Sequence, residues 1–188
     1  TQMVAKGHHF PDLTLVGVVD ADLGLGGADL RGGELSWQLL TQVAGRAGRA
    51  SRPGQVLLQT AMPEAMVLQS LIHDDRESFI AAEKAARSEA AMPPYGRLAA
   101  VILSGRDEAR LMMMAKQMAN DWPHFEGVTL LGPAPAPLRL LRRNYRVRFL
   151  LKSSREVNLQ RVISSWLDRI TIPSAINCQV DIDPVSFF

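Results

Sequence analysis

Two shortages in this sequence exclude whole classes of protein. Cys178 is the single cysteine among 188 residues, which excludes an internal disulfide framework and a zinc site built from cysteines. No apolar stretch reaches the roughly 18 residues that a membrane-spanning helix needs, so we expect no transmembrane segment. The chain begins at Thr1 inside patterned sequence and has no signal-peptide pattern. We therefore expect a cytoplasmic protein.

A third shortage concerns nucleotide chemistry. The chain contains no phosphate loop of the form G-x-x-x-x-G-K-[ST] and no acidic motif for magnesium. It therefore lacks a complete nucleotide-phosphate site of its own. We expect no ATPase or helicase activity from this chain by itself.

The composition is that of an ordinary globular protein, but its charges are unevenly distributed. Apolar residues make up 47% of the chain, enough for a normal core, and the net charge is only +2. Between positions 139 and 161, however, the only acid is Glu156. The basic residues of that segment are Arg139, Arg142, Arg143, Arg146, Arg148, Lys152, Arg155 and Arg161. Arginines suit two-pronged contacts with phosphate.

The first half of the chain has the hydrophobic pattern of α/β structure. A continuous apolar run at 13–20 predicts a buried strand of a parallel sheet that ends in Asp20. Ligands of α/β proteins usually gather at such strand ends, so Asp20 is a candidate cofactor-binding residue. Further along we predict a helix at 34–43, a strand at 54–60 and helices at 66–72 and 75–91. This order indicates the end of an α/β domain.

The second half has a different pattern, and the turn at 93–96 marks the boundary, so we expect two domains, 1–92 and 93–188. In the second we predict strands at 98–103, 128–131, 145–151 and 178–182, and helices at 107–122 and 154–170. The β-α-β-β-α-β order indicates a small split-βαβ sandwich. The proline-rich segment 133–137 is expected to form an extended connector. The residues expected to be mainly core are Met112, Met113, Met114, Met118, Trp122, Trp166 and Cys178; the alternative for the methionines is a surface that binds a partner.

The most specific string ends the predicted helix 34–43 and reads Gln42-Val43-Ala44-Gly45-Arg46-Ala47-Gly48-Arg49. Arg46 and Arg49 stand three apart among small residues, so their guanidinium groups have little steric cover. Such a pair suits a nucleotide site, where it meets the charge that develops on a transferred γ-phosphate. Gly45 is a candidate for cofactor contact in the same string. The alternative is a solvated helix end, where cations favour the negative pole of the helix dipole.

The segment at 1–11 precedes the first predicted strand and supplies a second candidate site. Its polar residues and Gly7 are expected in a loop that faces both a nucleotide and a nucleic-acid backbone. The Thr1 hydroxyl suits a DNA phosphate, and Lys6 adds positive charge. The adjacent pair His8-His9 has no acidic or cysteine partner at zinc spacing, so we expect no metal site.

Several strings together resemble a known helicase family. Motifs V and VI of superfamily 2 helicases are similar to TQMVAKGHHFPDLTLVGVVDADLGL, LLTQVAGRAGRA and PGQVLLQT in this chain. More narrowly, the chain resembles the primosomal protein N-prime family of bacterial replication-restart helicases. The same family is matched by MPPYGRLA, LGPAPAPL, NYRVRFLLK and the DIDP string at 181–184. The resemblance therefore runs from Thr1 to Phe188.

This resemblance implies the C-terminal portion of an ATP-dependent 3′-to-5′ DNA helicase that restarts stalled replication forks by primosome assembly. It implies an incomplete second RecA-like lobe at 1–92 and a ribosomal S10-like domain at 93–188. ATP and magnesium would lie between two lobes of the full-length enzyme, and zinc in a cysteine-rich region outside this chain. The motif VI positions are matched by Gln42, Arg46 and Arg49, with Arg49 as the arginine finger. The motif V positions are matched by Thr1, Gly7 and His9, where His9 replaces the aspartate of many superfamily 2 helicases.

The basic segment is the candidate nucleic-acid surface of the second domain. Its expected DNA contacts are Arg142, Arg143, Arg146, Arg148 and Lys152. Strand alternation puts Tyr145, a candidate base-stacking ring, on the opposite face from Arg146 and Arg148. The alternative is a solvated strand face with Tyr145 in the core. The resemblance supports binding of single-stranded and forked DNA.

The resemblance also implies protein partners. It implies docking of the acidic tail of single-stranded-DNA-binding protein, for which Arg155 and Gln160 are candidates, and contacts with other primosome proteins. Two other functions stay open: a non-catalytic nucleic-acid-binding module, and an adaptor whose basic patch receives acidic peptides. The Gln42–Arg49 string favours the helicase, because a scaffold has no use for it. Steep salt dependence would favour DNA over a peptide.

Overall fold

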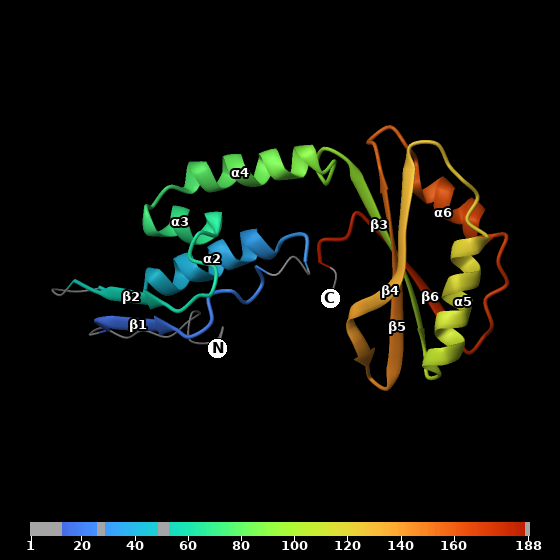
Figure 1. Ribbon diagram of the computed structural model, residues 1–188, viewed down its shortest axis with the longest axis horizontal. Helices are drawn as coiled ribbons and strands as arrows, with labels where there is room; N and C mark the ends of the chain where they lie inside the picture. The colour runs from blue at the N-terminus through green and yellow to red at the C-terminus, as the bar shows by residue number, and fades with distance from the viewer. Residues whose placement is uncertain (1–12, 26–28, 49–52, 187–188) are drawn as a thin grey trace. The chain divides into compact units, whose positions relative to one another are not determined.

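The computed structural model describes residues 13–25, 29–48 and 53–186. The chain divides into two compact units, Thr1–Lys84 and Ala85–Phe188, and each has its own sheet (Figure 1). No helix in the described part of the chain is both long and apolar enough to cross a membrane.

The first unit contains two short parallel strands and the helices that follow them. Strands β1 (Leu15–Val18) and β2 (Gln55–Leu58) pair in parallel, with Val18 beside Leu58. The helices are α2 (Gly32–Ala44), α3 (Met66–Ile72) and the first part of α4 (Arg76–Glu89). All five elements predicted for this half are present, and both strands are shorter than predicted.

The core of the first unit joins its three helices. Leu40 of α2, Val67 and Leu68 of α3 and Phe79 of α4 are all buried. Trp37 stacks on Phe79 with ring centroids 5.0 Å apart and the planes 7° from parallel. Trp37 and Leu40 stand three apart, so one face of α2 carries both side chains into this core.

One face of the two-stranded sheet is apolar and exposed. Val18 and Leu58 pack against the helical core. On the other face Leu15 is 52% exposed and Leu57 is 61% exposed. Parallel strands are normally covered on both faces. The first unit therefore exposes leucines that a larger α/β domain would bury.

The second unit has the predicted β-α-β-β-α-β order. Its elements are β3 (Arg97–Gly105), α5 (Glu108–Asn120), β4 (Val128–Leu141), β5 (Asn144–Ser153), α6 (Leu159–Leu167) and β6 (Asn177–Ile182). The strands lie in the order β4-β5-β3-β6, and each neighbouring pair is antiparallel. Both helices cover the same face of this sheet (Figure 1). This arrangement has the strand order of a split-βαβ unit.

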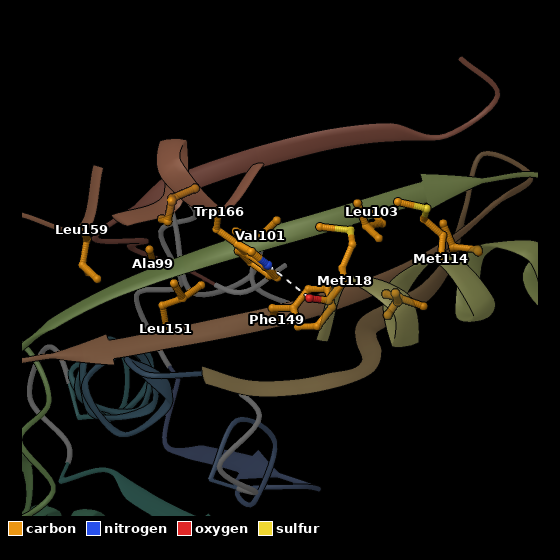
Figure 2. Close-up of a cluster of buried hydrophobic side chains, with 13 residues drawn as sticks. Ala99, Val101, Leu103, Met114, Met118, Phe149, Leu151, Leu159 and Trp166 are labelled. Atoms are coloured by element: carbon orange, nitrogen blue, oxygen red, sulfur yellow. Dashed lines mark hydrogen bonds between the residues drawn. The ribbon is translucent and has the colours of Figure 1, made fainter. Parts of the chain in front are cut away.

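A large apolar core lies between this sheet and its two helices (Figure 2). Trp166 of α6 is fully buried, and its indole N–H donates to the carbonyl of Met118 in α5 at 3.1 Å. Its ring meets Phe149 and Trp122 edge to face, with centroids 5.2 and 5.0 Å away. The prediction that the tryptophans are packing residues is confirmed.

The methionines are mainly core, as predicted. Met114 and Met118 are buried and Met112 packs against the same cluster, whereas Met113 is 64% exposed. Cys178 of β6 is half-buried, and burial raises the pKa of its thiol. Both observations are compatible with the packing role expected for Cys178, and its expected lack of reactivity stays a prediction.

Side-chain caps decide where the two helices begin. The Asp107 carboxylate accepts the N–H of Arg110 at 3.0 Å, and the Asn158 side chain accepts the N–H of Arg161 at 3.0 Å. Each satisfies a donor that the first helical turn leaves without a partner. The predicted helix at 154–170 was therefore too long. The hydrophobic spacing continues on both sides of α6, but the helix begins only after the cap at Asn158.

The prediction of a proline-rich connector was wrong. Strand β4 continues through 133–137, and Ala134 and Pro135 pair with Arg148 and Val147. Register shifts on either side of this pairing accommodate the prolines. Because β4 is an edge strand, a proline that lacks an N–H can face away from the ladder.

The division between the units also differs from the predicted boundary. It falls between Lys84 and Ala85, within α4, rather than at residue 92. The Lys152 ammonium donates to the carbonyl of Ala90 at 3.0 Å, which ties the end of α4 to the second sheet. The pair Pro93-Pro94 marks a turn in the sequence. The contact between Lys152 and Ala90 shows that the residues just before this turn already belong to the second unit.

Candidate functional site

The residues of the Gln42–Arg49 string lie at the C-terminal end of α2. Gln42 is exposed, Arg46 is half-buried and Gly45 caps the helix with its N–H bonded to the carbonyl of Thr41 at 2.9 Å. Arg49 lies outside the described residues, as do Thr1, Lys6, Gly7 and His9. Of this string, the structure therefore brings Gln42, Gly45 and Arg46 together at the end of one helix.

Two glycines fix the position of this turn. The Gly48 N–H donates to the carbonyl of Leu13 at 3.1 Å, just before β1. Gly48 has a φ of +75°, and a Cβ added to Gly54 would lie 2.1 Å from the Gly48 nitrogen. Only glycine allows so close an approach. The second glycine of the string is thus explained by packing, and Arg46 is held near the amino ends of β1 and β2.

Asp20 lies at the other end of the strands. It is exposed after β1, and its carboxylate accepts the N–H of Asp22 at 3.1 Å. The extended run from Leu13 to Val18 spans about 16 Å at the usual rise of a strand. The structure therefore does not bring Asp20 together with Gly45 and Arg46, and the predicted cofactor set is divided between two ends of the sheet.

Sequence reasoning missed Asp22, which joins the carboxyl ends of the two strands. Its carboxylate accepts the Thr60 hydroxyl and the N–H of Ala61, the latter at 2.7 Å. These hydrogen bonds, that from Thr60 first, hold the pKa of Asp22 below its usual value. The only sequence signal was a polar residue at or near the end of each predicted strand: Asp22 follows 13–20, and Thr60 is the last residue of 54–60.

The basic strand β5 separates its side chains by face, as predicted. Tyr145 packs against the core of the second unit, whereas Arg146 and Arg148 are half-buried on the opposite side of the strand. The Nη1 atom of Arg146 is buried and has no hydrogen-bond partner among the described residues. The Lys152 ammonium caps the end of α4 at Ala90. The predicted DNA contacts on β5 are thus in different environments.

The β4–β5 turn carries two exposed arginines. Leu141 pairs with Asn144, so Arg142 and Arg143 form a two-residue loop, with φ values of 50° and 65°. Positive φ at both positions is the signature of a type I′ hairpin turn. Within the described ranges, neither side chain has a hydrogen bond, an ion pair or a ring contact.

Arg139, unlike the two turn arginines, forms an ion pair. Its Nε and Nη2 atoms donate to the two carboxylate oxygens of Glu108 at 2.8 and 2.7 Å. Its guanidinium carbon lies 5.9 Å from the centroid of the Tyr145 ring. The hydrogen bond from Arg139 holds the pKa of Glu108 below its usual value. Arg139 therefore fastens the hairpin to the first turn of α5.

The predicted partner-binding residues lie at the start of α6. Arg155 and Gln160 are both exposed, and the Gln160 side-chain carbonyl accepts a long hydrogen bond of 3.5 Å from Arg97. Arg97 in turn pairs with Asp183 at 2.8 Å. Sequence reasoning missed Arg97, because its partners lie 63 and 86 residues away in the chain.

Comparisons with known proteins agree along the whole chain. Residues 88–185 match the family described as the Primosomal protein N C-terminal domain. Among similar proteins, Replication restart protein PriA of Rickettsia felis is 45% identical over all 188 residues, which are 29% of its length. The protein of the same name from Bacillus subtilis is 38% identical over 89% of this chain and 21% of its own length. That of Haemophilus influenzae is 34% identical over 98% of this chain and 26% of its own length. The chain thus spans less than a third of the length of these relatives.

Proposed function

Because the chain belongs to the Primosomal protein N C-terminal domain family, we propose that it is the C-terminal part of a replication-restart DNA helicase. The full-length enzyme would unwind DNA in the 3′-to-5′ direction at the expense of ATP and assemble the primosome at stalled forks in the bacterial cytoplasm. The observation that carries this proposal is the continuous similarity, over the whole chain, to a protein named Replication restart protein PriA.

The first unit would be part of the second RecA-like motor lobe. The exposed Leu15 and Leu57 support this, because further strands and helices of a complete lobe would cover them. ATP with magnesium would be held mainly by the preceding part of the enzyme, and its hydrolysis would drive unwinding. Gln42, Arg46 and Arg49 would supply polar and cationic groups from the end of α2.

Arg46 suits a contact with the γ-phosphate of ATP better than Asp20 does. A guanidinium at a helix end can reach the charge that develops on the γ-phosphate. Asp20 lies at the far end of β1 and belongs to a different surface. In the full-length enzyme, Arg46→Ala should lower kcat for ATP hydrolysis by roughly a hundredfold or more with little change in ATP affinity. The chain alone should show no ATPase activity.

The second unit would bind DNA, and the S10-like fold that we propose for it would suit nucleic-acid binding. The contacts that the geometry supports best are Arg142 and Arg143, which are exposed and unpaired within the described ranges. Arg146 and Arg148 would extend this surface along β5. Arg139 and Lys152 have structural partners, so we give them a smaller part in binding.

The start of α6 would dock protein partners. Arg155 and Gln160 are exposed there, and Arg97 adds a second guanidinium beside Gln160. This combination suits an acidic peptide, such as the tail of single-stranded-DNA-binding protein. It also supports the alternative function, a non-catalytic module that binds nucleic acid or acidic peptides.

Fluorescence anisotropy with labelled single-stranded and forked DNA tests the DNA proposal. We expect binding by the whole chain to weaken steeply between roughly 50 and 200 mM salt, because each phosphate contact releases counterions. Arg146→Ala/Arg148→Ala should weaken binding, whereas Lys116→Gln/Arg169→Gln removes the same charge from exposed positions outside the basic segment and should not. Absence of binding at the lowest salt would remove the DNA surface and leave the peptide module as the function of this unit.

A further inference from the structure

The tip of the β4–β5 hairpin, residues 138–144, exposes apolar and basic side chains together. Leu138, Leu140 and Leu141 are 42%, 57% and 43% exposed. Arg142 and Arg143 follow directly in the turn. One exposed leucine needs no explanation, but three within four residues at the end of one hairpin are unusual. These leucines face solvent and are not part of the core of the second unit.

The backbone conformation of the turn does not explain why arginine stands at both positions 142 and 143. A type I′ turn favours Asn-Gly, since both central residues have positive φ. For a residue with a Cβ that conformation is unfavourable. Arginine at both positions therefore adds guanidinium groups at the cost of turn stability.

The chain segment that contains the tip carries side-chain charge of one sign. No acidic residue stands between Gly127 and Arg155, a segment that carries Arg139, Arg142, Arg143, Arg146, Arg148, Lys152 and Arg155. Glu108 neutralises Arg139 and fastens the arm to α5. The two turn arginines thus project from an anchored arm, and their charge suits an anionic partner.

We propose that the hairpin tip contacts the boundary between duplex and single-stranded DNA. The leucines would pack against the exposed face of the last base pair, while Arg142 and Arg143 contact phosphates of the strands that part there. This proposal rests on the proposed DNA-binding function and adds to it the DNA structure that the tip recognises.

A boundary fits the tip better than a uniform duplex does. Uniform duplex presents charged phosphates on its outside and keeps the ring faces of its bases stacked. At a boundary, one flat apolar ring face lies beside phosphates of both strands. Aliphatic wedges used by other DNA-binding proteins act on base steps in the same way. A surface with adjacent leucines and arginines matches that combination.

The test compares a forked DNA with a dumbbell duplex of the same sequence, whose two ends are closed by loops. The whole chain should bind the fork roughly tenfold more tightly, the scale of one base-stacking contact. A 2-aminopurine in the last base pair of the fork should change its fluorescence on binding, because the leucines alter its stacking.

Two variants separate the apolar from the basic contribution. Leu138→Ser/Leu140→Ser should abolish the preference for the fork and the 2-aminopurine signal, while affinity for the dumbbell stays the same. Arg142→Asn/Arg143→Gly keeps a favoured turn and should weaken fork binding. The slope of log K against log salt concentration should become less steep by the amount expected for about two lost phosphate contacts. Lys116→Gln/Arg169→Gln, at exposed positions outside the basic segment, should behave as the unaltered chain.

The results distinguish failure of the boundary contact from failure of the DNA-binding function. If the serine variant keeps its preference for the fork, or the unaltered chain binds fork and dumbbell equally, the boundary contact is overturned and DNA binding stands. If the chain binds anionic vesicles but neither DNA, both the boundary contact and the DNA-binding function are overturned.

Discussion

Arg139 and Glu108 join the β4–β5 hairpin to the first turn of α5 through two parallel hydrogen bonds, Nε to Oε1 at 2.8 Å and Nη2 to Oε2 at 2.7 Å. Paired bonds of this kind are more directional than a single ion pair. They fix the base of the arm whose tip carries Arg142 and Arg143. Because the Glu108 carboxylate can be protonated, this pair also makes the attachment of the hairpin to α5 depend on pH.

The Arg139–Glu108 pair should open in acid. The pKa of Glu108 lies below its usual value of 4.5, so the stabilisation is fully present above pH 4.5. It is lost as pH falls through the lower pKa of the folded state. An NMR titration of the Arg139 Nε–H signal should follow this loss. Glu108→Ala, which removes the acceptor, should give the unpaired signal at every pH. A signal unchanged by acid in the native chain would show that the pair does not form.

Replacing the turn arginines should stabilise the second unit. Arg142→Asn/Arg143→Gly supplies the residues that a type I′ turn favours, and we expect a gain of about 1 kcal/mol in the free energy of unfolding. Urea denaturation followed by circular dichroism measures the change. The single variant Arg161→Gln, on the surface of α6, should leave stability unaltered. A loss of stability in the turn variant would mean that the arginines contribute contacts to the fold.

Trp166 should be among the most sensitive positions of the second core. Trp166→Phe removes buried volume and leaves the Met118 carbonyl without its donor. The combined cost should be about 2–4 kcal/mol in the free energy of unfolding. Met113→Ala, on the exposed face of α5, should change stability by less than about 0.5 kcal/mol. Equal effects in the two variants would contradict the assignment of Trp166 to the centre of this core.

Gly54 should tolerate no side chain. A Cβ there would lie 2.1 Å from the Gly48 nitrogen, so Gly54→Ala must displace the turn that holds Arg46. We expect a loss of more than about 1 kcal/mol in the stability of the first unit. Gly17→Ala is the matched control, because nothing lies within 4 Å of a Cβ added to Gly17. Thermal unfolding of both variants measures the difference, and an unimpaired Gly54→Ala chain would show that Gly48 and Gly54 are not in contact.

The order of helices and strands could be predicted because hydrophobic spacing is a local property. Helix α3 begins and ends where the pattern at 66–72 places it. The alternation along β5 likewise predicts that Tyr145 and Arg146 lie on opposite faces of the strand, and they do. Boundaries were predicted less well where a cap or an edge position decides them, as at Asn158 and Pro135.

The candidate site was predictable only in part. Its residue types stand in the Gln42–Arg49 string and in the basic segment. Their surroundings depend on residues far along the chain: Arg139 pairs with Glu108, Lys152 with Ala90 and Arg97 with Asp183. Such partners are not visible in local spacing.

The sequence by itself determined the family, the order of the elements and the faces of β5, because motifs and periodicity lie in neighbouring residues. Only the tertiary structure decided which arginines remain unpaired and at which end of β1 Arg46 lies. The physical reason is that an ion pair or a close glycine contact forms between segments that the sheets bring together. Arg142 and Arg143 are exposed because they form the two-residue turn at the end of the β4–β5 hairpin.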